Sequence, residues 1–301
     1  MSLPLPPSDP GDLRRVAFLG TPEIAVPTLV ALCDAGYEIP MVVSGADKRR
    51  GRGKETSPTP VKAEALERNL PVATAVDELL DVHQLHPIDL GVVVAFGQII
   101  RPHVLSEIPM VNIHFSALPR WRGAAPVERA ILEGDTETAV AVMTVSEGLD
   151  EGDVWAQVPV PIDADATLES LRDEMSIEGA RLLIDLMTRG FSTPEPQVGE
   201  VRYAHKLTTD DLRLDWDRPA TELHRIVRVG DAWTTLDGTR FKIHAASIVE
   251  STLLPGVIQD GVVGTSDGGL DLITVQPAGK PRMGADAWAN GAQPNGKVFG
   301  V

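Results

Sequence analysis

Cysteine is almost absent from this sequence of 301 residues, which has Cys33 alone. One cysteine cannot form an internal disulfide, so we expect a chain suited to a reducing compartment, the cytoplasm. No run of eighteen apolar residues occurs, which excludes a membrane-spanning helix on the sequence. No basic segment followed by an apolar run opens the chain, so we predict no secretory signal. Residues 1–13 are rich in proline and are expected to form a disordered lead-in.

Positive charge is also scarce, because the formal net charge is −16. Such a surface does not favour nonspecific binding of nucleic acid over the whole molecule. The exception is the segment Lys-Arg-Arg-Gly-Arg-Gly-Lys at residues 48–54. A short basic run is usually a solvated loop, and the alternative is an arm that contacts phosphates.

The first strand-like segment lacks the three glycines of a dinucleotide-binding turn. Residues 14–20 predict a buried strand, and Gly20 is followed by a turn and a helix that ends near Asp34. This opening predicts a doubly wound, mostly parallel α/β sheet of Rossmann-like type. Without the second and third glycines, a nicotinamide oxidoreductase is disfavoured. His83 and His86 have no supporting cysteine or carboxylate cluster, so no metal site is predicted.

The remaining patterns divide the chain into two predicted domains. Strands are predicted at 88–95, 139–145 and 154–161, and a long amphipathic helix at 168–189 closes a domain that spans residues 14–190. Residues 191–207 are expected to be a linker, because most of this stretch is rich in proline, glycine, serine and threonine. Short strands broken by glycines then predict a small C-terminal β-barrel, OB-like, over residues 208–301.

The most informative stretch is residues 110–126. It begins as a compact apolar strand, on which Asn112 and His114 share one face because they are two residues apart. An amide and a protonated imidazole can both donate hydrogen bonds to an oxyanion, and imidazole also moves protons near neutral pH. A satisfied polar pair without chemistry is the alternative that these two residues leave open.

The full pattern is longer: Asn-x-His-x-Ser-x-Leu-Pro-x-x-Arg-Gly-Ala-Ala-Pro at 112–126, followed by Gly-Leu-Asp-Glu-Gly-Asp at 148–153. This pattern resembles the folate-dependent formyltransferases, and the resemblance extends from about residue 14 to residue 301. Ala117 stands where the family usually has leucine, which we expect to change only the packing of an apolar contact.

The resemblance implies roles for particular residues. It assigns catalysis to Asn112 and His114, and it assigns the orienting carboxylate to Asp150, with Asp153 as the second choice. It also implies that two loops hold the folate, at Phe96, Gly97, Gln98, Ile99, Ser116, Ala117, Leu118 and Pro119. By the same resemblance, the basic loop contacts tRNA through Arg49, Arg50, Arg52 and Lys54.

The resemblance is strongest to members that move the formyl group of 10-formyltetrahydrofolate to the α-amino group of methionine on initiator tRNA. It therefore implies an enzyme with folate as cosubstrate and initiator methionyl-tRNA as partner, without a metal or a membrane, acting as a monomer. Three alternatives remain: a family member that formylates a sugar-nucleotide amine or glycinamide ribotide, the nicotinamide oxidoreductase, and a noncatalytic RNA-binding protein. A small substrate needs neither a basic loop nor a C-terminal barrel, and a noncatalytic protein would have lost Asn112, His114 and Asp150.

Overall fold

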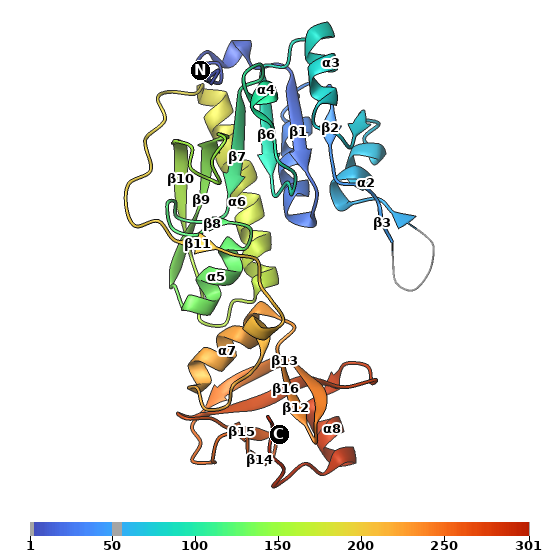
Figure 1. Ribbon diagram of the computed structural model, residues 1–301, viewed down its shortest axis with the longest axis vertical. Helices are drawn as coiled ribbons and strands as arrows, with labels where there is room; N and C mark the ends of the chain where they lie inside the picture. Colours follow the sequence, from blue (N-terminus) through green and yellow to red (C-terminus); the bar gives the residue numbers. More distant parts are fainter. Residues whose placement is uncertain (1–2, 50–55, 301) are drawn as a thin grey trace. The chain divides into compact units, whose positions relative to one another are not determined.

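The structure, a computed structural model, describes residues 3–49 and 56–300, with the side chains of residues 48 and 49 left out (Figure 1). The chain forms two compact units. The first comprises Met1–Pro126, Glu137–Pro161 and Arg172–Ala204. The second comprises Val127–Thr136, Ile162–Leu171 and His205–Val301. Both units are thus discontinuous in sequence, and the continuous domain boundaries expected at residues 190 and 208 stay predictions.

The first unit is built on a seven-stranded sheet in the order β10-β9-β7-β6-β1-β2-β5. Its strands are β1 Val16–Gly20, β2 Val42–Val43, β5 Val72–Ala73, β6 Leu90–Val94, β7 Met110–His114, β9 Glu137–Thr144 and β10 Val154–Pro161. The pairs β2–β5, β1–β2, β1–β6 and β6–β7 are parallel, whereas β9 is antiparallel to both β7 and β10. The predicted doubly wound, mostly parallel sheet is confirmed.

The central strands are apolar on both faces because helices cover the sheet on both sides. Every residue of β1 and β6 is buried. The helices of the first unit are α1 Val26–Asp34, α2 Pro60–Glu67, α3 Glu78–Leu85, α4 Pro102–Leu105 and most of α6 Leu168–Arg189. The helix α5 Pro126–Glu133 belongs to the second unit from Val127 on. The 3-10 turns are η1 Pro10–Asp12 and η2 Glu23–Ala25. The helix that was predicted after the turn at residues 20–22 thus begins with η2 and becomes α-helical at Val26, with proline in the first positions of α1.

Two short strand pairs lie outside the main sheet. The strands β3 Lys48–Arg49 and β4 Thr56–Ser57 pair antiparallel. The strands β8 Arg122–Gly123 and β11 Tyr203–Ala204 pair parallel. The second pair joins the central motif to the segment that was predicted to be a linker.

The packing of α6 decides which face of β7 carries Asn112 and His114. A Cβ atom on Gly179 of α6 would lie 2.9 Å from Ile113 Cγ2 and 3.2 Å from Val140 Cγ1. Ile113 therefore faces α6 at close range. Because side chains alternate along a strand, Asn112 and His114 project from the opposite face of the sheet.

The second unit contains a six-stranded antiparallel sheet in the order β12-β13-β16-β15-β14, with β17 paired to β16. Its elements are η3 Asp210–Leu212, α7 Ala220–Val229, β12 Trp233–Leu236, β13 Thr239–Val249, β14 Ile258–Gln259, β15 Val262–Gly264, β16 Gly269–Pro277, β17 Met283–Gly284 and α8 Ala285–Ala292. Val298 bridges Val257 beside β14, and Phe299 bridges Leu236 of β12. The C-terminal segment thus pairs at both edges of the sheet, which closes it as a small barrel requires.

An aromatic cluster fills the interior of this barrel. Phe299 contacts Trp216, Phe241 and Trp288, with ring centroids 5.5, 5.0 and 6.3 Å apart. The helix α7 covers the cluster with Leu223, Ile226 and Val227, which recur at helical spacing and are all buried.

Candidate active site

The end of β7 places an amide and an imidazole side by side on one face of the sheet. Asn112 is half-buried, and His114 has 5% of its surface exposed. Their partners across the β7–β9 pair are Met143 and Ala141. These two partners form an apolar cluster with Leu118, so the two polar side chains lie beside an apolar surface.

The ring of His114 is held from two sides. Its Nε2 atom lies 2.9 Å from the carbonyl oxygen of Trp121, and its Nδ1 atom lies 3.6 Å from Asp150 Oδ2. Because a carbonyl oxygen only accepts, Nε2 carries the hydrogen in this contact. The other ring nitrogen, Nδ1, faces the Asp150 carboxylate.

Asp150 is brought to this position by the turn between β9 and β10. Its φ of +51° lies in the left-handed region, which aspartate tolerates better than most residues. Its Oδ2 atom accepts a 2.8 Å hydrogen bond from the backbone N–H of Gly123, which fixes the carboxylate. Asp153, the second choice of the sequence prediction, is exposed, and its carbonyl oxygen accepts from Thr144 N.

The segment after β7 is shaped by its own backbone contacts. Ser116 is fully buried, and its hydroxyl donates to the carbonyl oxygen of Arg120 at 2.6 Å. The Leu118–Pro119 peptide bond is cis. The hydroxyl of Ser116 is thus used to hold this turn, in which the other predicted folate residues, Ala117 to Pro119, are buried or half-buried.

The second predicted folate loop follows β6. Val94 of β6 pairs with Ile113 of β7, so the loop at 95–100 begins beside the end of β7. Phe96 is half-buried against the core, whereas Gly97, Gln98 and Ile99 are exposed, Ile99 by 88%. The structure therefore places both predicted folate loops at the carboxyl ends of neighbouring strands, where open α/β sheets bind ligands.

Two glycines permit the close contacts of this site. A Cβ atom on Gly152 would lie 1.9 Å from the carbonyl oxygen of Thr144. Gly123 has a φ of +120°, and a Cβ there would lie 2.9 Å from the carbonyl oxygen of Ala204. The Asp150 turn and the start of α5 can approach their neighbours only because these positions carry no side chain.

Sequence reasoning missed the side chains of Arg122 and Gln197. Gln197 donates to the carbonyl oxygens of Asp150 and Gly152 and accepts from the guanidinium of Arg122. Arg122 was visible within the motif, but Gln197 lies in the predicted linker, where no spacing or motif marked it.

Two family models match the chain in succession. Residues 14–187 match the model described as formyl transferase, and residues 206–293 match the model of the formyl transferase C-terminal domain. The first match alone covers more than half of the chain. The chain belongs to the formyl transferase family.

Within the formyl transferase family, the chain is 40% identical to the methionyl-tRNA formyltransferase of Paenarthrobacter aurescens, over 95% of this chain and 99% of that protein. Solved structures share the fold at lower identity. The N-formyltransferase from Helicobacter canadensis, in complex with folinic acid and dTDP-3-aminofucose, is 16% identical with a TM-score of 0.66, over 86% of this chain and 99% of that one.

HypX from Aquifex aeolicus, solved in complex with tetrahydrofolic acid, is 19% identical with a TM-score of 0.63 and covers 91% of this chain. The chain spans about half the length of HypX, because the match covers 46% of that protein. Formyl transferase folds with folate derivatives bound are thus known among the structural neighbours.

Of the four residues predicted to contact tRNA, the structure describes only Arg49, by its backbone. Arg49 belongs to β3, where its backbone pairs with Thr56. Arg50, Arg52 and Lys54 lie outside the described residues. Their role stays a prediction.

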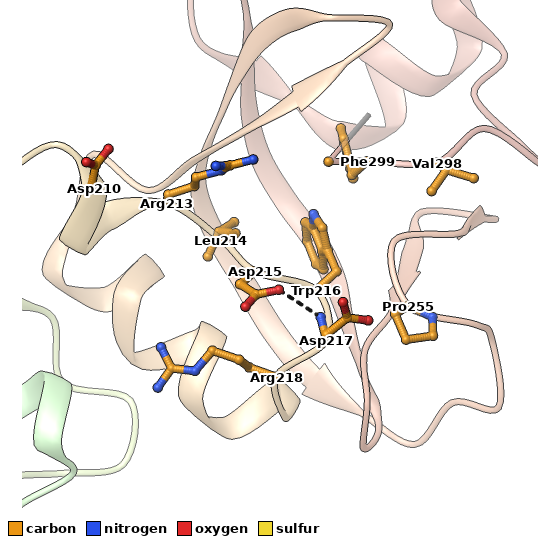
Figure 2. Close-up of a pocket in the computed structure, with 11 residues that line it drawn as sticks. Asp210, Arg213, Leu214, Asp215, Trp216, Asp217, Arg218, Pro255, Val298 and Phe299 are labelled. Atoms are coloured by element: carbon orange, nitrogen blue, oxygen red, sulfur yellow. Dashed lines mark hydrogen bonds between the residues drawn. The ribbon is translucent and has the colours of Figure 1, made fainter.

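A separate cavity of about 660 Å³ lies within the second unit (Figure 2). Figure 2 shows charged side chains such as Arg213 and Arg218 together with the apolar Pro255 and Val298. None of the residues predicted for catalysis or folate binding lines it. The candidate site is therefore defined by its side-chain geometry at the end of β7.

Across residues 3–49 and 56–300, no group of three histidine, cysteine, aspartate or glutamate side chains could hold a metal ion. Among the helices of those same ranges, none is long and apolar enough to cross a membrane.

Proposed function

We propose that this protein transfers the formyl group of 10-formyltetrahydrofolate to the α-amino group of methionine on initiator tRNA, which gives N-formylmethionyl-tRNA for translation initiation. The observation that carries the proposal is the His114–Asp150 contact beside Asn112, within a formyl transferase fold. The identity of 40% to a methionyl-tRNA formyltransferase over nearly the whole chain selects this acceptor among those of the family. Because charged tRNA is used in translation there, we place the reaction in the cytoplasm.

The reaction begins when the neutral amine of the methionyl group attacks the formyl carbon. A carbon–nitrogen bond forms, and the formyl oxygen takes up negative charge in the tetrahedral intermediate. The Asn112 amide donates a hydrogen bond to that oxygen, and protonated His114, whose two N–H groups face Trp121 O and Asp150, stabilises it by its charge. Such donors act most strongly beside an apolar surface, which the Leu118, Ala141 and Met143 cluster supplies.

Collapse of the intermediate breaks the bond between the formyl carbon and N10 of the folate. The attacking nitrogen loses a proton to Asp150 through a water molecule, and N10 gains that proton by return through the same water, so Asp150 ends as the carboxylate and the number of protons is conserved. Asp150 stabilises the imidazolium form of His114 and accepts the proton of the amine through a water molecule. No covalent intermediate with the protein is needed.

The two loops at the ends of β6 and β7 hold the folate in this proposal. The loop of Phe96, Gly97, Gln98 and Ile99 offers exposed backbone and apolar surface to a flat ring. The turn of Ser116, Ala117, Leu118 and Pro119 forms the opposite support, with Ser116 fixing the turn from within. The tetrahydrofolate complex of HypX, whose fold this chain shares, supports a folate cosubstrate for this chain.

The basic loop at 48–54 and the C-terminal barrel are assigned to tRNA. The loop has five lysine or arginine residues among seven in a chain with a net charge of −16. Such a loop attracts phosphates by local charge alone. An enzyme for a small amine would need no comparable extension.

The test offers 10-formyltetrahydrofolate and three amine acceptors in parallel: initiator methionyl-tRNA, elongator methionyl-tRNA and a nucleotide-linked amino sugar. We expect rapid formyl transfer to the initiator and little to the other two. Transfer to the amino sugar alone would keep the chemistry but overturn the acceptor. Absence of transfer to all three would refute the proposed function.

A further inference from the structure

Residues 195–204, within the predicted linker, contact the Asp150 turn, the start of β10 and the segment that follows β7. At one end, Glu195 and Val154 exchange two backbone hydrogen bonds of 2.8 Å. At the other end, Ala204 O accepts from the N–H groups of Ala124 and Ala125, and Arg202 O accepts from Arg122 N. A free linker would make no such regular contacts, so this segment is part of the first unit.

Gln197 is the member of this segment whose side chain reaches the Asp150 turn. Its Nε2 atom donates to Asp150 O at 2.9 Å and to Gly152 O at 2.8 Å. Its Oε1 atom accepts from Nε and Nη2 of Arg122 at 3.0 and 2.8 Å. Both hydrogens and both lone pairs of the carboxamide are therefore engaged.

This pattern fixes the orientation of the amide. The two carbonyl oxygens need donors, and the guanidinium needs an acceptor, so exchanging Oε1 and Nε2 would turn all four contacts into clashes of like groups. Arg122 is also 3.7 Å from the carboxylate of Glu151. Gln197 thus links the guanidinium to the backbone on both sides of Glu151.

The Asp150 backbone needs such support, because a φ of +51° is sparsely populated by residues with a side chain. One of the two carbonyl groups held by Gln197 belongs to Asp150 itself, and the other belongs to Gly152, two residues later in the same turn. The carboxylate of Asp150 in turn lies 3.6 Å from His114 Nδ1. A shift of the turn by about 1 Å is enough to lower a rate by about 100-fold when charge placement matters.

We propose that Gln197 is a positioning residue for Asp150: its carboxamide holds the Asp150 turn so that the carboxylate faces His114. The inference rests on the proposed function, since Asp150 serves His114 in that reaction. Gln197 acts through Asp150 and touches no reacting atom.

The first test compares Gln197→Ala with Gln197→Glu and with the control Val198→Ala, whose side chain is 87% exposed. We expect Gln197→Ala to lower kcat by about 10- to 50-fold while KM for the folate changes less than about threefold. Gln197→Glu keeps the shape and an acceptor for Arg122 but aims a carboxylate oxygen at two carbonyl oxygens, so it should be no more active than Gln197→Ala. The control should retain wild-type kcat. Wild-type activity in Gln197→Glu would overturn the proposal.

A double-mutant cycle separates positioning from a general structural role. In an Asp150→Ala background, replacing Gln197 should lower the single-turnover rate by no more than about twofold, because the group that it positions is gone. The same loss in both backgrounds would contradict the inference. If Gln197→Ala lost its thermal transition, Gln197→Met, of similar volume and without donors, would replace it.

Amide hydrogen exchange supplies a readout that needs no substrate. Gln197→Ala should exchange faster than wild type at residues 148–152, with unchanged exchange in the barrel of the second unit. Equal exchange at 148–152 would overturn the inference even if the enzyme were active. If wild type transferred no formyl group, the proposed function would fail, and this measurement would still decide whether Gln197 holds the turn.

Discussion

Two buried histidines, one in each unit, differ in their charged neighbours, and on this difference we propose His114 for catalysis and a structural role for His224. His114 and His224 are 5% and 7% exposed, and in both rings Nε2 lies near a backbone carbonyl oxygen, at 2.9 and 3.1 Å. The charges around them differ in sign. His114 faces the carboxylate of Asp150, whereas burial and the nearby Arg228 lower the pKa of His224, with Asp165 opposing them.

Burial and a carbonyl anchor are common to both histidines, so their charged neighbours are what separates them. Desolvation favours the neutral ring of His224 on α7, which suits a fixed donor to the Ala246 carbonyl. His114 has the same kind of anchor and also faces the carboxylate of Asp150, and its proposed role at the oxyanion rests on this geometry. The following predictions test this difference.

The largest effect is expected from replacing Asn112 or His114 with alanine. Each change removes one group that stabilises the oxyanion in the proposed reaction, so turnover should fall by about 100- to 1,000-fold. Steady-state formyl transfer to initiator methionyl-tRNA measures it, with circular dichroism as the check on folding. Near-normal turnover in both folded variants would show that Asn112 and His114 on β7 do not form the catalytic site.

Asp150→Asn should have the next largest effect. The asparagine keeps an oxygen that accepts from Gly123 N but lacks the charge that stabilises the imidazolium, so kcat should fall by about 100-fold. The same change at the exposed Asp153 is the control and should leave kcat within about twofold. Equal losses in the two variants would show that the choice of Asp150 is wrong.

A smaller effect is expected from replacing Gly152 of the Asp150 turn with alanine, and Gly148 of the same turn serves as its control. A Cβ atom on Gly152 would lie 1.9 Å from a backbone oxygen, whereas one on Gly148 would meet the movable side chain of Glu151. Gly152→Ala should therefore lower the free energy of unfolding by about 1–3 kcal/mol and reduce kcat. Gly148→Ala should change the free energy of unfolding and kcat only slightly. Thermal melting and initial rates test the pair, and similar melting temperatures would refute the packing argument.

The smallest effect concerns His224 and pH. Because its pKa is lowered in the folded state, the unfolded chain binds the proton more readily, and stability falls as the pH drops below about 6.5. Above that pH both states are neutral at this residue, and its contribution to the pH dependence disappears. Between pH 6.5 and 5, the melting temperature of His224→Gln should therefore fall less than that of wild type, and the difference should be a few degrees at most. Parallel curves for the two proteins would contradict the assigned pKa direction.

Much of the fold was predictable because its signals are local. The strand Val154–Pro161 and the helix Leu168–Arg189 were predicted with their observed bounds, since alternation and helical periodicity are read within one segment. The buried strands β1 and β6 also gave clear apolar runs. The start of α1 was missed because the sequence does not separate η2 from a first helical turn.

The candidate site was predictable only in part. Asn112 and His114 share a face by strand alternation alone, and the resemblance to the formyltransferases supplied Asp150. Gln197 could not be found this way, because its contact with Asp150 spans 47 residues and lies in a segment without periodicity. Nor does sequence order reveal that Val127–Thr136 and Ile162–Leu171 pack with the C-terminal sheet, since that depends on long-range contacts.

The most direct measurement applies one substitution to both histidines. His114→Gln and His224→Gln would be compared with wild type in single-turnover formyl transfer from 10-formyltetrahydrofolate to initiator methionyl-tRNA. We expect the first variant to be slower by about 100-fold or more and the second to stay within about twofold, because only His114 faces the reacting groups. Equal rates in the two variants would contradict the assignment of catalysis to the His114–Asp150 pair.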